Sequence, residues 1–230
     1  MLEIKLLLRR SNAYSSLQDF EKSKADLDKI LILEPQHPEA AQKLKVIQKR
    51  LDEVTPEHCI LASNTSSIPL INLGTATKRP ERVLGLHFFN PATVQKLCEI
   101  VVSIATDDAV VVACEKFAQN TLGKETIRSK DRAGFIVNAL LFPYLNNAIR
   151  MLEQGTANMA DIDTAMKGGC NFPMGPFALL DLVGLDTSVS ILDALYAEFK
   201  DENIVPAKTL RTLLAEGKLG RKTKQGFFSY

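Results

Sequence analysis

Glycine does not occur before Gly74 in this chain of 230 residues, and the pattern GxGxxG occurs nowhere in it. The first third of the chain therefore contains no Gly-rich turn of the kind that cradles phosphates. An excess of one charge is also missing, because 28 basic side chains face 27 acidic ones and the net charge is +1. This balance gives no basic surface for nucleic acid and no acidic tail.

Closely spaced cysteines and long apolar runs are absent as well. Cys59, Cys98, Cys114 and Cys170 are far apart and form no CxxC, so we expect buried, reduced thiols and no metal site. No apolar stretch is long enough to span a membrane, and the apolar core of "MLEIKLLLRR" is too short for a signal peptide. We therefore predict a cytoplasmic protein with no membrane partner.

Residues 1–53 carry apolar side chains at helical spacing. "LQD" interrupts a first helix, "EPQHP" ends a second, and "PEAAQKLKVIQKRLDEV" predicts a third that begins at Pro38. This order resembles one tetratricopeptide repeat plus a following helix, on the residues Tyr14, Phe20, Leu27 and Pro35. Since about three repeats are needed to bury the apolar faces, we expect this face to rest on another part of the protein.

The polar side of these helices allows two interpretations. Lys5 and Arg9 are four residues apart and resemble part of the clamp with which some such repeats hold a peptide's terminal carboxylate. A solvated helix face is the alternative. The first reading predicts a peptide or protein partner for residues 1–53.

From Thr55 the pattern alternates between strands and helices. "RVLGLHFF", "KLCEIVVS" and "KETIRS" predict strands, and "DDAVVVACEKFAQNTLG" predicts a helix that stops at Gly123. This alternation favours a parallel or mixed sheet with covering helices. After Asp131 only helices are predicted, and the first of them contains Pro143. The expected fold class is α/β plus all-α.

Several stretches in sequence order resemble the 3-hydroxyacyl-CoA dehydrogenases. They are "ILASNTSSIPLINL", "RPERVLGLHFFNPATVQKLCEIV", "DRAGFIVNALLFPYLNNAIRMLEQG", "DIDTAMKGGCNFPMGPFALLDLVGLDT" and "GKLGRKTKQGFFSY". The likeness covers residues 52–230 and is greatest to the short enzymes that act on 3-hydroxybutyryl-CoA. It implies the second half of a Rossmann-type NAD-binding domain at 54–130 and a helical substrate and dimerisation domain at 131–230, which follow the tetratricopeptide-like helices at 1–53.

The resemblance also implies a chemistry, the NAD-dependent oxidation of a 3-hydroxyacyl-CoA in fatty acid metabolism. His87 would be the base that takes the hydroxyl proton, and Glu99 would hold its other ring nitrogen. We expect the two on adjacent strands. Ser66 and Asn138 would bind the substrate oxygens, and Asn64 would lie near the nicotinamide end of NAD. The family further implies a homodimer formed through residues 131–230.

The cofactor half of such a domain is not recognisable in the sequence. A Rossmann domain opens with a strand and GxGxxG, which receives the pyrophosphate at a helix N-terminus, whereas repeat-like helices stand in that place here. We therefore expect a truncated sheet and little activity from this chain alone. Two alternatives stay open: a non-catalytic helical-repeat scaffold, and a fragment that a partner chain completes.

Overall fold

The computed structural model describes two compact units, Met1–Phe135 and Ile136–Tyr230. Residues 1, 18, 20–21, 24–25, 28–29, 31–37 and 66–67, with the side chains at 2, 3, 5 and 41, lie outside the description. The first unit joins the two N-terminal parts that the sequence separates at residue 54. The division into three domains stays a prediction.

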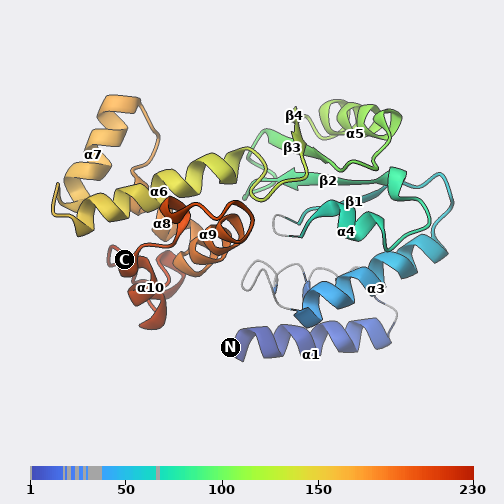
Figure 1. Ribbon diagram of the computed structural model, residues 1–230, viewed down its shortest axis with the longest axis horizontal. Helices are drawn as coiled ribbons and strands as arrows, with labels where there is room; N and C mark the ends of the chain where they lie inside the picture. Colours follow the sequence, from blue (N-terminus) through green and yellow to red (C-terminus); the bar gives the residue numbers. More distant parts are fainter. Residues whose placement is uncertain are drawn as a thin grey trace. The chain divides into compact units, whose positions relative to one another are not determined.

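A four-stranded mixed sheet in the order β1-β2-β3-β4 forms the centre of the first unit (Figure 1). Its strands are β1 (Leu61–Ser63), β2 (Val83–Phe88), β3 (Leu97–Val102) and β4 (Glu125–Lys130). β1 and β2 run parallel, β2 and β3 antiparallel, and β3 and β4 parallel. The predicted mixed sheet is therefore confirmed, as are the three strands that the sequence named.

Helices cover both faces of this sheet (Figure 1). On one face lie α1 (Leu2–Ser16), α3 (Pro38–Val54) and α4 (Leu70–Gly74), and on the other lies α5 (Asp108–Asn120). Side chains alternate along each strand, so successive residues serve opposite cores. Val83 and Val101 join the helices α1, α3 and α4, while Leu84 and Ile100 pack with α5.

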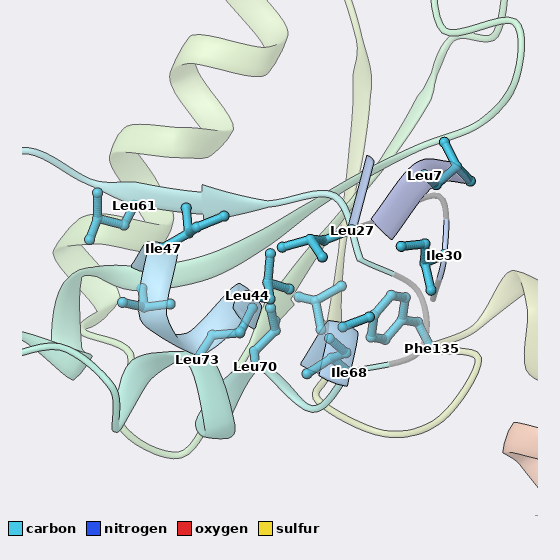
Figure 2. Close-up of a cluster of buried hydrophobic side chains, with 13 residues drawn as sticks. Leu7, Leu27, Ile30, Leu44, Ile47, Leu61, Ile68, Leu70, Leu73 and Phe135 are labelled. Atoms are coloured by element: carbon cyan, nitrogen blue, oxygen red, sulfur yellow. The ribbon is translucent and has the colours of Figure 1, made fainter. Parts of the chain in front are cut away.

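The N-terminal helices bury their apolar side chains against the sheet. Leu7, Leu27, Ile30 and Leu44 share one buried cluster with Leu61 of β1 and Leu70 of α4 (Figure 2). We expected the apolar face of the N-terminal helices to rest on another part of the protein, and it rests on the sheet and α4. The predicted third helix is confirmed over Pro38–Val54. Phe20, Pro35 and the Lys5 side chain lie outside the described residues, so the repeat and its clamp stay predictions.

Arg79 ties the end of α3 to the segment before β2. Its Nε donates to Asp52 Oδ1 at 2.6 Å, and Nη2 donates to Asp52 O at 3.0 Å and to Thr55 Oγ1 at 2.6 Å. Nη1 donates to the Pro56 carbonyl oxygen. Both charged side chains are almost fully buried, at 8% and 5% exposure. The guanidinium thus satisfies carbonyls that a helix end leaves without partners.

Replacing this guanidinium should destabilise the first unit strongly. We expect Arg79→Ala to lower its free energy of unfolding by about 3–5 kcal/mol, because the Asp52 carboxylate would stay buried without its cation. Urea unfolding measures the change. Arg50→Ala removes the exposed pair with Glu53 and should change stability by less than about 1 kcal/mol. Equal effects of the two substitutions would contradict a buried clamp.

The second unit consists of helices, as the sequence predicts. They are α6 (Val137–Glu153), which contains Pro143, α7 (Met159–Cys170), α8 (Pro176–Val183), α9 (Leu185–Phe199) and α10 (Lys208–Ala215). Asp181 of α8 fixes the C-terminal segment, since its carboxylate accepts hydrogen bonds from the Phe227 and Phe228 N–H groups at 2.9 and 2.8 Å. A Cβ at Gly226 would lie 2.0 Å from that carboxylate, so only glycine fits there.

All four cysteines are free. Cys98 and Cys114 are buried, as predicted, but Cys59 is half-buried and Cys170 is exposed, so the expectation of burial is wrong for these two residues. Burial raises the pKa of the Cys98 thiol to about 11, which keeps it protonated and unreactive at neutral pH. Among the helices that the structure describes, none has both the length and the apolarity needed to cross a bilayer.

Candidate active site

His87 and Glu99 face each other across two neighbouring strands. They are directly opposed in the antiparallel register of β2 and β3, and His87 Nδ1 lies 2.7 Å from Glu99 Oε2. Opposed residues in such a pair project from the same face of the sheet. The predicted pairing of the two side chains is confirmed, while their catalytic roles stay a proposal.

The strand pattern explains why two ionisable groups lie inside an apolar unit. His87 and Glu99 occupy the same alternation as Val83 and Val101, so they point toward the face that α4 covers. His87 is 7% exposed and Glu99 is fully buried. A buried carboxylate is costly unless it is paired, and the imidazole supplies a hydrogen-bond donor. The pair is therefore part of the interior and not a surface contact.

The bond to Glu99 sets which ring nitrogen carries the proton. With Glu99 as a carboxylate, which only accepts hydrogen bonds, the donor in this bond is the Nδ1–H of the imidazole. Nε2 then carries a lone pair, as a general base requires. The site thus offers one basic nitrogen, held by a carboxylate behind it.

The ends of β1 and β2 lie at the same edge of the sheet because the two strands are parallel. Asn64 directly follows β1, and its Oδ1 accepts a hydrogen bond from the Phe88 N–H at 2.9 Å. Phe88 is the neighbour of His87, so Asn64 lies beside the candidate base. In open α/β sheets, ligands bind beyond the carboxyl ends of the strands, and Asn64 stands at such an end.

Of the two other predicted site residues, the structure describes only Asn138. Ser66 lies outside the described residues. Thr65 donates its N–H to Ser63 Oγ at 3.3 Å and accepts the Ile68 N–H on Oγ1 at 3.1 Å. Asn138 is half-buried in the first turn of α6, in the second unit. Its role in binding a substrate oxygen stays a prediction.

Sequence reasoning missed the aromatic surroundings of the imidazole. The His87 ring lies 4.9 Å from the ring of Phe89 and 5.2 Å from that of Phe135, measured between centroids. Phe89 was visible in "LHFFN" as a near neighbour. Phe135 is distant in sequence, and no local signal indicates its contact. Among the described residues, no group of three histidine, cysteine or acidic side chains could hold a metal ion.

Two family models cover nearly the whole chain. The model of the 3-hydroxyacyl-CoA dehydrogenase NAD binding domain matches residues 9–132, and that of the C-terminal domain matches residues 134–230. The chain belongs to the 3-hydroxyacyl-CoA dehydrogenase family. It is thus a member of an oxidoreductase family whose cofactor is NAD. The first match begins inside the segment that resembles a tetratricopeptide repeat.

Individual relatives agree with this membership. A 3-hydroxybutyryl-CoA dehydrogenase of Mycobacterium tuberculosis is 46% identical over 203 residues, which is 88% of this chain and 71% of that protein. The human mitochondrial hydroxyacyl-coenzyme A dehydrogenase is 48% identical over 184 residues, 79% of this chain and 58% of that protein. The crystal structure of M. tuberculosis FadB2 superposes with a TM-score of 0.81 at 48% identity, covering 83% of this chain and 67% of that one.

Proposed function

We propose that this chain transfers hydride between NAD and the carbinol carbon of a 3-hydroxyacyl-CoA thioester, with His87 as the base that takes the hydroxyl proton. The observation that carries the proposal is the 2.7 Å bond between His87 Nδ1 and Glu99 Oε2 in a buried cross-strand pair. A pair of this kind is expensive to bury, and proton transfer is the use that fits its geometry.

The proton step follows from the tautomer. The substrate hydroxyl gives its proton to His87 Nε2 as the carbon–oxygen bond becomes a carbonyl. The imidazolium that forms keeps its Nδ1–H on Glu99, whose negative charge stabilises it. In the reverse direction the same Nε2–H returns the proton. Asn64 would hold the nicotinamide end of NAD, which would supply the acceptor for the hydride of the carbinol carbon.

The residues fit one end of NAD and not the other. Asn64 presents an exposed side chain at the end of β1, where the nicotinamide end would lie. Its Oδ1 is used by Phe88, so the amide nitrogen is the group left to donate to a ligand. The pyrophosphate end requires a Gly-rich turn, and the chain contains no GxGxxG. We therefore propose weak cofactor binding by this chain alone.

The substrate class comes from the relatives. Their names refer to 3-hydroxybutyryl-CoA and hydroxyacyl-coenzyme A, and we propose a short 3-hydroxyacyl-CoA, an intermediate of fatty acid metabolism. Ser66 and Asn138 would hold its oxygens. NADH formation from 3-hydroxybutyryl-CoA, compared with free 3-hydroxybutyrate, tests this assignment. Equal rates with both would count against a thioester substrate.

The second unit is proposed to form a homodimer. Several of its apolar side chains are exposed: Leu140 at 71%, Phe172 at 41%, Leu182 at 49% and Phe199 at 40%. Exposed apolar side chains on one unit favour association. We expect sedimentation of the purified chain at micromolar concentration to give a dimer. A monomer under these conditions would contradict the proposal.

Three further assignments stay proposals. The compartment is proposed to be the cytoplasm, on the four free cysteines, although relatives include mitochondrial enzymes. A peptide or protein partner of the N-terminal helices would have to use their polar side, where Arg9 is exposed, because their apolar side is buried on the sheet. The third assignment is a partner chain that completes the NAD site, since this chain contains no GxGxxG.

A further inference from the structure

Phe89 and Phe135 together restrict the plane of the candidate base. The ring of Phe89 makes an angle of 66° with the imidazole of His87, and that of Phe135 an angle of 68°, so both contacts are edge-type. A single hydrogen bond from Nδ1 to Glu99 fixes one atom of the imidazole and leaves rotation about that bond open. Aromatic contacts limit this rotation, and they thereby determine where Nε2 points.

Phe135 reaches His87 through an unusual backbone conformation. Its φ is +50°, directly after Gly134 at +73°. Positive φ is rare for a bulky side chain and persists only where the surroundings impose it. The Phe135 N–H donates to Arg132 O at 3.0 Å and closes the turn. A glycine would adopt this turn without strain, so the interactions of the ring must offset the strain of the backbone.

The turn that carries Phe135 is anchored to the sheet. The Asp131 N–H donates to Val102 O at 3.1 Å, at the end of β3, and Asp131 Oδ2 accepts the Ile71 N–H of α4 at 3.0 Å. The Glu99 strand β3 and the helix α4 therefore hold the base of the turn. These contacts hold the backbone that leads to Phe135.

The side chain of Phe135 is also buried in the apolar cluster of the first unit. Phe135 is 9% exposed and belongs to the cluster that contains Leu7, Leu27 and Ile30 of the N-terminal helices (Figure 2). Phe135 is thus a member of this apolar cluster whose ring also contacts the His87 imidazole. The cluster fixes the ring, and the ring fixes the imidazole.

We propose that Phe135 is a positioning residue, which holds the His87 imidazole so that Nε2 points at the substrate hydroxyl. The proposal rests on the proposed role of His87 as the base. It assigns a function in catalysis to the strained turn at residues 134–135 and to the N-terminal helices that support it.

Histidine ring resonances in NMR spectra test this positioning without any need for turnover. The chain has only three histidines, so His87 can be assigned by comparison with His87→Ala. In Phe135→Leu we expect the His87 ring protons to shift and its Nδ1–H to exchange faster with water. Phe142→Leu, at a buried phenylalanine of the second unit, is the matched control and should leave His87 unchanged. Unchanged His87 signals in Phe135→Leu would overturn the proposal.

A second variant separates positioning from folding. Phe135→Gly removes the ring but suits the positive φ, so it should keep a higher unfolding midpoint than Phe135→Ala. It should nevertheless show the same change at His87. For Phe135→Leu we expect kcat to fall about tenfold to a hundredfold with KM nearly unchanged, as for a misplaced reacting group. The same fall in kcat/KM, caused by a higher KM with kcat unchanged, would contradict a positioning role.

Different results would contradict the proposal that His87 is the base and the proposal that Phe135 positions it. If His87→Ala leaves turnover unchanged while Phe135→Leu still shifts the His87 signals, the base assignment is wrong and the contact stands. If His87→Ala abolishes turnover but Phe135→Leu alters neither the signals nor kcat, the base stands and the positioning residue is wrong.

Discussion

The purified 230-residue chain should bind NAD only in the millimolar range or more weakly. A dinucleotide derives much of its affinity from backbone N–H groups that meet its pyrophosphate at a helix N-terminus. Each hydrogen bond to a charged group contributes about 1.5–3 kcal/mol, so losing three of them weakens binding by roughly three to six powers of ten. The chain has no GxGxxG to provide these bonds.

Calorimetric titration with NAD measures this affinity directly, and the M. tuberculosis 3-hydroxybutyryl-CoA dehydrogenase is the control. At equal, ordinary cofactor concentration we expect turnover of 3-hydroxybutyryl-CoA to be at least about a thousandfold below that of the control. A micromolar dissociation constant for this chain would contradict the argument. It would mean that the N-terminal helices or a second chain rebuild a phosphate site.

Loss of the imidazole should abolish most of the remaining turnover. We expect His87→Ala to lower kcat by about 10²–10⁴-fold, the usual contribution of a general base. The matched control is His58→Ala, at an exposed histidine of the same unit, which should retain the parent rate. Circular dichroism of each variant establishes that the fold is kept. Equal rates for the two variants would remove His87 from the reaction.

Glu99→Gln distinguishes charge from hydrogen bonding at the same site. The amide oxygen still accepts the Nδ1–H, but it no longer offers a negative charge to the imidazolium, so kcat should fall while the fold is kept. Glu115→Gln, which neutralises a carboxylate paired with Arg128 near the surface, is its control. A parent-like kcat in Glu99→Gln would show that the charge is not used.

Much of the fold could be predicted because its signals are local. The apolar runs "RVLGLHFF" and "KLCEIVVS" predicted β2 and β3, and the acidic start and Gly123 stop around α5 predicted that helix. The pair His87–Glu99 could be predicted too, since two adjacent strands joined by a short connection bring opposed residues together. Asn64 was predicted from the resemblance to the family, whereas its hydrogen bond from the Phe88 N–H could be seen only in the structure.

What escaped prediction depends on contacts between distant residues. No periodicity in "DRAGFIVN" indicates that Phe135 adopts a positive φ or that its ring reaches His87. Arg79 reads as an ordinary surface cation in "TKRPER", and only the fold shows that it is buried at the end of α3. The sequence also left open which surface receives the N-terminal helices, because an apolar helix face does not specify its partner.

The rate of NADH formation from 3-hydroxybutyryl-CoA, followed as the NAD concentration rises in the parent chain and in His87→Ala, tests the account most directly. We predict a slow rate in the parent that increases without saturating below millimolar NAD and that His87→Ala abolishes. Such a result requires an intact proton-transfer pair beside an incomplete cofactor site. A rate that saturates at micromolar NAD, or one that is equal in the two proteins, would contradict it.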